Sequence, residues 1–377
     1  MTRAASLLRG RRVCVCAGPG GVGKTTVAAA LATGLAASGL KVAVVTIDPA
    51  RRLADALGLA ALGDEQRRVD PERLAAAGLA LDGELWALCL DAKRTWDQVV
   101  ARYAPDTTTR EAILANPVYR HLSSAVAGTQ EYMAMEKLYE LADAGRYDMV
   151  VLDTPPTRNT LDFLDTPGRL LRFVDSRSLR LLSAPGRLGL KLAGRSAGAV
   201  FGALERISGV ELLRDVGEFL RAFDSMADDF RARATRVREL LGDPATAFMA
   251  VSSPRPESVA ETIFLTGRLR ESGIGLTAAI VNRVHGAAPL DAKGRGELSR
   301  RLGDQLAEKV ARGARGAQAL AERDRDGLER LRAGLAGVPM LEVPELEADV
   351  HDLGGLARVS RHLFGAEDAP QAQTGAP

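Results

Sequence analysis

The residues with the clearest chemical potential lie near the start of the chain, in the stretch 18–26, which reads GPGGVGKTT. This spacing fills the phosphate-binding pattern G-x-x-x-x-G-K-[ST] completely. Glycines let successive backbone N–H groups curl around phosphate oxygens, because no Cβ atom blocks the approach. In this pattern Lys24 reaches the β- and γ-phosphates, and the Thr25 hydroxyl binds Mg²⁺. The residues expected to bind the nucleotide here are Gly20, Gly21, Val22, Gly23, Lys24, Thr25 and Thr26.

Two aspartates at strand ends are candidates for phosphate hydrolysis, which needs charge neutralisation, a metal site and an oriented water. Asp153 follows the apolar run 149–152 (MVVL), the Walker B arrangement, and would support Mg²⁺ directly or through water. Asp48 follows the apolar run 40–47 and could orient or deprotonate the water. Either aspartate could also cap a helix, a role compatible with catalysis. We therefore expect the catalytic residues to be Asp48, Lys24 and Asp153, and the Mg²⁺ ligands, partly through water, to be Thr25, Asp48 and Asp153.

Apolar strands alternate with helices along most of the chain, which is typical of a parallel sheet covered by helices on both faces. The predicted strands cover residues 12–16, 40–47, 85–90, 147–152, 246–251, 276–281 and 338–343. The polar residues that directly follow strands are Asp48, Asp91, Asp153, Ser252 and Asn282. Ligands bind at the carboxyl ends of strands in such sheets. We therefore predict an α/β fold with a doubly wound, mostly parallel sheet that gathers these polar residues beside the phosphate loop.

The length of 377 residues fits one nucleotide-binding domain with an insertion. We expect this domain over residues 1–365 and a disordered tail over 366–377. The sheet core is placed at about residues 10–92, 145–165 and 244–365, and an inserted helical subdomain at about 93–144 and 166–242. Prolines 105 and 117 should divide the first part of this subdomain into shorter helices. A further amphipathic helix is predicted where apolar residues recur every four positions, at Leu298, Leu302, Leu306 and Val310.

Composition and charge argue against several classes of protein. A net charge of +2 gives no basic footprint, so we expect no nucleic-acid partner. The cysteines (Cys14, Cys16 and Cys89) form no C-x-x-C pair, so no zinc site is expected. No apolar run approaches about 18 residues, and the N-terminus does not resemble a signal peptide. We expect a cytoplasmic protein, with a peripheral position at the membrane as the alternative.

Three motifs in order identify a family that the chain resembles. They are residues 18–26, residues 46–50 (TIDPA) and residues 153–157 (DTPPT). Together they are similar to the arsenite-transporting and tail-anchored-protein-targeting ATPases, within the larger group that includes nitrogenase iron protein and the ParA/MinD partition ATPases. The resemblance runs to about Phe364 and is strongest to the actinobacterial branch. It implies an ATP hydrolase with ATP and Mg²⁺ as its ligands.

The resemblance also implies roles for single positions. Asp48 corresponds to the aspartate of switch I that activates water, and residues 153–157 correspond to switch II. Asn282 matches the asparagine that reads adenine, and Pro344 and Leu346 belong to the loop that packs on the base. Members of this family work as nucleotide-gated dimers, with ATP at the interface and helical subdomains that open and close.

Two departures from the family pattern concern the partner. Members usually carry a lysine directly after the first glycine of the loop, where this chain has Pro19, which supplies neither charge nor N–H. Either Arg51, Arg52 or Arg158 replaces that lysine in a homodimer, or a related ATPase supplies it in a heterodimer. The interfacial C-x-x-C zinc motif and an arsenite-binding cysteine cluster have no counterpart here, which argues against arsenite-stimulated pumping.

The segment 161–241 leaves the partner open. Its first part interleaves apolar residues with arginines, and the family uses this region as a groove for hydrophobic client helices. It could therefore bind a hydrophobic protein client or a membrane-associated partner, or form a basic helix packed within its own subdomain. Three hypotheses follow: a switch that releases a protein partner, the energising subunit of a membrane anion transporter, and the weakly hydrolysing half of a heterodimer.

Overall fold

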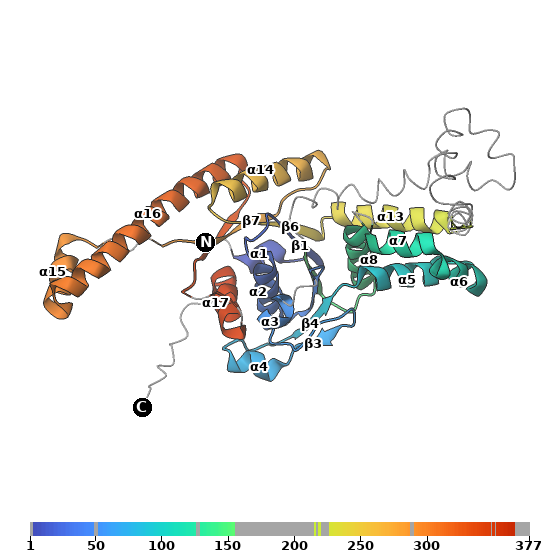
Figure 1. The fold of residues 1–377 in the computed structure, drawn as a ribbon, viewed down its shortest axis with the longest axis horizontal. Coiled ribbons are helices and arrows are strands. Elements are labelled where there is room, and N and C mark those ends of the chain that lie inside the picture. Colours follow the sequence, from blue (N-terminus) through green and yellow to red (C-terminus); the bar gives the residue numbers. More distant parts are fainter. Residues whose placement is uncertain are drawn as a thin grey trace. The chain divides into compact units, whose positions relative to one another are not determined.

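The computed structural model describes residues 3–48, 52–125, 129–154, 215, 218–219, 226–286, 290–347, 349–350 and 352–365. The chain divides into two compact units (Figure 1). The sheet unit comprises Met1–Cys89, Gly145–Thr160 and Pro244–Pro377, and the helical unit comprises Leu90–Ala144 and Leu161–Asp243. Most of the segment 161–241, with its predicted client groove, lies outside the described residues, as do Arg51, Arg158 and the tail 366–377.

The sheet unit contains an eight-stranded sheet in the order β3-β4-β2-β5-β1-β6-β7-β8. Its strands are β1 (Val13–Ala17), β2 (Lys41–Thr46), β3 (Arg67–Arg68), β4 (Glu84–Cys89), β5 (Met149–Asp153), β6 (Thr246–Ser252), β7 (Ala278–Val284) and β8 (Met340–Pro344). All neighbouring strands run parallel except β3, which is antiparallel to β4. The predicted α/β fold with a mostly parallel sheet is therefore confirmed. The sequence did not predict β3, because two arginines carry no apolar pattern.

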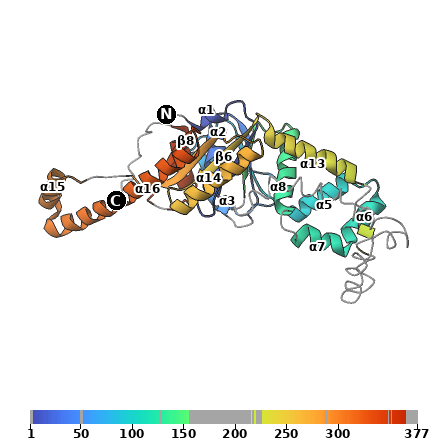
Figure 2. The ribbon, with the colours of Figure 1, turned by 90° about the horizontal axis from the view of Figure 1, so that it is seen from above.

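Helices cover both faces of this sheet (Figures 1 and 2). The helices of the sheet unit are α1 (Ala4–Leu8), α2 (Lys24–Ala37), α3 (Arg52–Ala56), α4 (Pro71–Ala76), α14 (Pro256–Glu271), α15 (Ala292–Leu302), α16 (Asp304–Gly334) and α17 (Leu353–Phe364). Of these, α15 lies away from the sheet, beside the first half of α16. Alternate residues of β7 pack on opposite sides, because side chains alternate along a strand. Ala278 and Ile280 join the core under α2 and α17, whereas Ala279 and Val281 join the core under α14 and α16.

The amphipathic helix predicted around Leu298–Val310 is wrong as one helix. It breaks at Gly303, which has φ 78° and separates α15 from α16. Glycine adopts this positive φ readily, so α15 can end there and α16 can begin at Asp304. The apolar repeat therefore crosses from the end of α15 into the first turns of α16.

The described part of the helical unit consists of α5 (Ala92–Tyr103), α6 (Thr107–Ala115), α7 (Pro117–Ala125), α8 (Thr129–Asp143) and α13 (Ala227–Gly242) (Figure 2). As predicted, Pro105 lies between two helices and Pro117 begins another. A buried ion pair joins α8 to α13, where Arg233 Nε lies 2.7 Å from Glu136 Oε1. Over the described residues, no helix is both long enough and apolar enough to cross a membrane.

Candidate functional site

The phosphate loop joins β1 to α2 and has the conformation that binds anions. Gly21 and Gly23 have φ values of 76° and 89°, which glycine adopts without the strain that a Cβ atom would bring. No side chain caps α2, so the N–H groups of its first turn stay available to an acceptor. The positive end of the helix dipole therefore faces the same space as the loop.

Lys24 lies across this loop and is only 7% exposed. Its Nζ donates a hydrogen bond of 2.8 Å to the carbonyl oxygen of Pro19. Burial lowers the pKa of Lys24, while the nearby carboxylate of Asp153 acts in the opposite direction. The ammonium group is thus held over the loop by a neutral backbone acceptor, which a phosphate oxygen could replace.

Asp153 lies beneath the loop at the end of β5 and is 2% exposed. Its Oδ2 accepts hydrogen bonds from the hydroxyls of Thr25 at 2.7 Å and Thr46 at 2.9 Å. Its Oδ1 is buried and has no hydrogen-bond partner among the described residues. Burial raises the pKa of Asp153 to about 6, although the two hydroxyls act in the opposite direction.

These donors fit a magnesium site of the kind found with nucleotides. Mg²⁺ keeps several waters and takes only one or two carboxylates from the protein, together with substrate phosphates. An unpartnered oxygen on Asp153, beside the Thr25 hydroxyl, matches that need. No cluster of three or more His, Cys, Asp or Glu side chains suited to a metal occurs in the described ranges, and such a site does not require one.

Asp48 and Arg52 form the opposite wall of the site. The Asp48 backbone N–H donates to the Thr46 hydroxyl at 3.2 Å, which connects this residue to the Asp153 carboxylate. Asp48 Oδ2 lies 3.7 Å from Arg52 Nη1, and the Arg52 side chain is 72% exposed. Of the arginines predicted to replace the absent lysine, Arg52 is the one that the described residues include.

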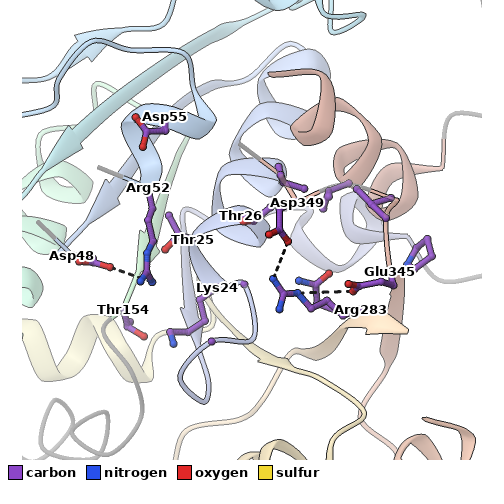
Figure 3. Close-up of a pocket in the computed structure, with 17 residues that line it drawn as sticks. Lys24, Thr25, Thr26, Asp48, Arg52, Asp55, Thr154, Arg283, Glu345 and Asp349 are labelled. Atoms are coloured by element: carbon purple, nitrogen blue, oxygen red, sulfur yellow. Dashed lines mark ion pairs between the residues drawn. The ribbon is translucent and has the colours of Figure 1, made fainter. Parts of the chain in front are cut away.

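These side chains meet at a cavity of about 380 Å³ in the sheet unit (Figure 3). The predicted site residues that line it are Gly21, Gly23, Lys24, Thr25, Thr26, Asp48, Asn282, Pro344 and Leu346. The predicted residues Gly20, Val22 and Asp153 do not line it. Val22 is a buried residue of the loop itself, whereas Asp153 is buried beneath the loop and contacts the lining residue Thr25.

Asn282 connects the far wall of the cavity to the phosphate loop. Its Nδ2 donates a 2.9 Å hydrogen bond to the carbonyl oxygen of Val22. A Cβ atom on Gly23 would lie 2.4 Å from this same nitrogen, so the close packing depends on glycine. Asn282 therefore braces the loop, in addition to its predicted contact with the nucleotide.

Several lining residues had no predicted role, namely Asp55, Arg283, Asp349, Val350 and Val359. Arg283 has φ 64° and lies where the pairing of β7 with β8 changes register. Its Nε lies 3.9 Å from Glu345 Oε2 and its Nη2 lies 3.7 Å from Asp349 Oδ1. Figure 3 marks both ion pairs with dashed lines. Arg283 directly follows the predicted site residue Asn282, and this neighbourhood was the sequence feature that could have indicated it. Its orientation toward the cavity depends on how β7 pairs with β8.

Two of the polar residues expected beside the loop, Asp91 and Ser252, do not line the cavity. Asp91 caps α5 in the helical unit, where its side chain accepts from the Arg94 backbone N–H at 3.0 Å. Ser252 is buried at the end of β6 and accepts a 2.8 Å hydrogen bond from the Thr262 hydroxyl, so it joins a structural network. Helix starts and strand ends favour the same residue types, which explains the capping role of Asp91.

Comparison with known proteins gives consistent matches. A family model described as anion-transporting ATPase matches residues 11–331. A putative arsenical pump-driving ATPase of Halobacterium salinarum is 38% identical over 177 residues, which is 46% of this chain and only 26% of that protein's length. Putative arsenical pump-driving ATPase 1 of Aquifex aeolicus is 25% identical over 94% of this chain and 79% of its own. ATPase GET3 of Malassezia globosa is 27% identical over 71% of each chain.

Proposed function

Because the chain belongs to the anion-transporting ATPase family, a family of ATP hydrolases, we propose that its sheet unit binds ATP with Mg²⁺ in the cavity and hydrolyses the γ-phosphate. The observation that carries this proposal is the contact between the phosphate loop and the strand-end carboxylate. Thr25 Oγ1 donates to Asp153 Oδ2 at 2.7 Å, beside a lysine held over the loop. This arrangement has the parts that phosphoryl transfer needs for positioning and charge neutralisation.

Each residue then has a defined task. The N–H groups of residues 21–25 and the Lys24 ammonium bind phosphate oxygens, and Lys24 exchanges its bond to Pro19 for one to phosphate. Thr25 and Asp153 would hold Mg²⁺, directly or through water, and the bound ion would supply positive charge to the phosphates. Asp48 orients the attacking water and takes its proton as the new P–O bond forms. The electron pair of the broken bond leaves with ADP.

We further propose that hydrolysis drives a dimeric switch. Arg52 takes the place of the lysine absent at Pro19, because it lines the cavity and its side chain extends into solvent. The helical unit is the subdomain that binds a client or partner, and the protein works in the cytoplasm. A membrane anion transporter is the second candidate partner, since two relatives are named as arsenical pump-driving ATPases. A heterodimer in which a related ATPase supplies the lysine remains the alternative to Arg52.

The test combines mass and turnover. Light scattering of the chain, with Mg²⁺ and a slowly hydrolysed ATP analogue, should show a dimer that disappears without nucleotide. Asp48→Asn should keep nucleotide affinity but lose about 10²–10⁴-fold in hydrolysis rate, the range of general-base catalysis. Asp82→Asn is the matched control, because Asp82 is exposed and precedes β4 on the other edge of the sheet.

Arg52→Ala distinguishes the two proposed replacements for the lysine absent at Pro19, which are Arg52 in a homodimer and a lysine of a related ATPase in a heterodimer. Loss of turnover and of the dimer in this variant would support Arg52 as the replacement for lysine. Nucleotide binding by a monomer without turnover, in the wild-type chain, would refute the homodimer and favour a second subunit. Failure to bind ATP at all would refute the proposed function.

A further inference from the structure

An apolar stripe lies exposed on the first half of α16. Its members are spaced four and three residues apart, at Leu306, Val310, Gly313, Ala317 and Leu320, which places them on one helix face. The side chains of Leu306, Val310 and Leu320 are 47%, 40% and 37% exposed. Leu302, at the end of α15, is 45% exposed and extends the apolar surface. We refer to residues 306, 310, 313, 317 and 320 as the α16 stripe.

The same face of α16 is buried further along the helix. Leu328, Leu331 and Leu335 continue the spacing and pack against β7 and α14. Gly327 approaches the chain before α14 so closely that a Cβ atom there would lie 2.1 Å from the Pro254 carbonyl oxygen. Figures 1 and 2 show the first half of α16 extending beyond α14, with α15 beside it. The second half of this helix face therefore packs on the sheet unit, whereas the first half is exposed.

Helix α15 does not cover the stripe, because it packs on a different face of α16. Ala307 and Ala311 are buried on that neighbouring face. The two helices form a hairpin, in which the small side chains of Ala307 and Ala311 allow close contact. The stripe is left as a shallow surface with small residues, Gly313 and Ala317, at its centre.

The charges beside the stripe are basic. By helical periodicity, Lys309 and Arg312 follow one edge of it, and neither forms an ion pair with a described residue. The acidic Glu308 lies one helical turn before Arg312, on the side of that edge away from the stripe, and pairs with Arg315 at 2.9 Å. A molecule covering the stripe would therefore gain from acidic groups along this edge.

Two other occupants fit less well. Two copies of α16 packed antiparallel would bring their basic edges together, and like charges across an interface are unfavourable. A membrane surface needs bulky apolar side chains that can insert, whereas the centre of the stripe is glycine and alanine and no aromatic residue belongs to it. Small central residues instead let a second helix approach closely.

We propose that the α16 stripe is a docking site for an amphipathic helix of a partner protein, with acidic residues along the edge of its apolar face. This mode of recognition lays an apolar helix face against a complementary surface. The inference goes beyond the ATPase activity, and the stripe does not line the nucleotide cavity. It assigns the partner surface to the sheet unit, separate from the helical unit.

The test uses a synthetic helical peptide with leucine at heptad positions a and d and glutamate at e and g. A matched peptide carries lysine in place of glutamate. In fluorescence anisotropy, the full chain should bind the glutamate peptide at least about tenfold more tightly, a difference that shrinks in high salt. Leu306→Ser should weaken this binding about tenfold, the loss expected when one large apolar contact is removed. Phe264→Ser is its control, because Phe264 is 62% exposed on α14.

Charge reversal provides the second arm. The double variant Lys309→Glu/Arg312→Glu should reverse the preference between the two peptides. Arg330→Glu, on the docked half of α16, should leave it unchanged. Equal binding of the two peptides, or equal loss in Phe264→Ser, would overturn the proposal.

Two further outcomes would assign the stripe to a different occupant, and a third distinguishes failure of the docking site from failure of the proposed function. A dimer that Leu306→Ser dissolves would assign the stripe to a second copy. Vesicles with anionic lipids that bind the wild-type chain, but not Leu306→Ser, would assign it to a membrane. ATP affinity is measured in the wild-type chain and in every variant. If the wild-type chain does not bind ATP, the proposed function is refuted. If it binds ATP but not the peptide, only the docking site is refuted.

Discussion

The buried carboxylate of Asp153 should make the stability of the sheet unit depend on pH in a direction opposite to most aspartates. Its pKa is raised from 3.8 to about 6, because burial disfavours the charged form. A shift of about 2 units corresponds to about 3 kcal/mol at 1.36 kcal/mol per unit. The folded state holds the proton more tightly, so this cost is absent below pH 3.8, grows between pH 3.8 and about 6, and is complete above that.

Asp153→Asn removes this pH dependence. Relative to the wild type, the free energy of unfolding of the variant should rise with pH, by about 2 kcal/mol of the full 3 between pH 4.5 and 7.5. Urea titrations followed by Trp86 fluorescence report on the sheet unit, since Trp86 belongs to β4. A Trp96→Phe background removes the signal of the helical unit, where Trp96 lies on α5.

The control for loss of one carboxylate is Asp82→Asn, at an exposed position. The difference in free energy of unfolding between Asp82→Asn and wild type should not show the rise with pH that is expected for Asp153→Asn. Parallel pH profiles of wild type and Asp153→Asn would refute the reasoning, because they would mean that the aspartate is not held in a charge-disfavouring site. The same variant should also lose Mg²⁺-dependent hydrolysis, so greater stability near neutral pH would accompany lower activity.

Other variants test single contacts. Arg233→Met should destabilise the helical unit by about 3–5 kcal/mol, followed by Trp96 fluorescence, because Glu136 stays buried without its partner; replacing both residues with apolar ones should cost less. Asn282→Asp should weaken ATP binding about tenfold more than Asn282→Ala in calorimetry, since both variants lose the hydrogen bond to the Val22 carbonyl but only the carboxylate also repels that oxygen and the phosphates. Gly23→Ala should also weaken ATP binding, because φ 89° and the Asn282 amide exclude a Cβ; unchanged affinities would refute these contacts.

Local pattern was sufficient for the parts of the site that follow directly from strand ends. The family resemblance inferred from three motifs is confirmed, as is the sheet that brings the phosphate loop, Asp48 and Asn282 to one cavity. An apolar strand followed by a polar residue fixes which edge of a parallel sheet that residue reaches. The same pattern does not determine the direction of the chain after the strand. Asp91, for example, caps helix α5.

Other features depended on long-range contacts or on a neglected local signal. Arg283 has a left-handed backbone conformation where the pairing of β7 with β8 changes register. No residue type near Arg283 in the sequence predicts this change of register. The break at Gly303 could have been predicted, because a glycine after Arg300 and Arg301 is typical of a helix end. The roles of the segment 161–241 stay a prediction.

Asp324 lies directly beyond the α16 stripe on the same helix face and is 1% exposed. Its Oδ2 accepts the His285 backbone N–H at 2.9 Å and lies 2.7 Å from His285 Nδ1, three residues after Asn282. The helix that carries the proposed docking surface is thereby fastened to the strand that braces the phosphate loop. Linkage then requires reciprocity: any factor by which ATP changes the affinity for a helical partner is the factor by which that partner changes the affinity for ATP.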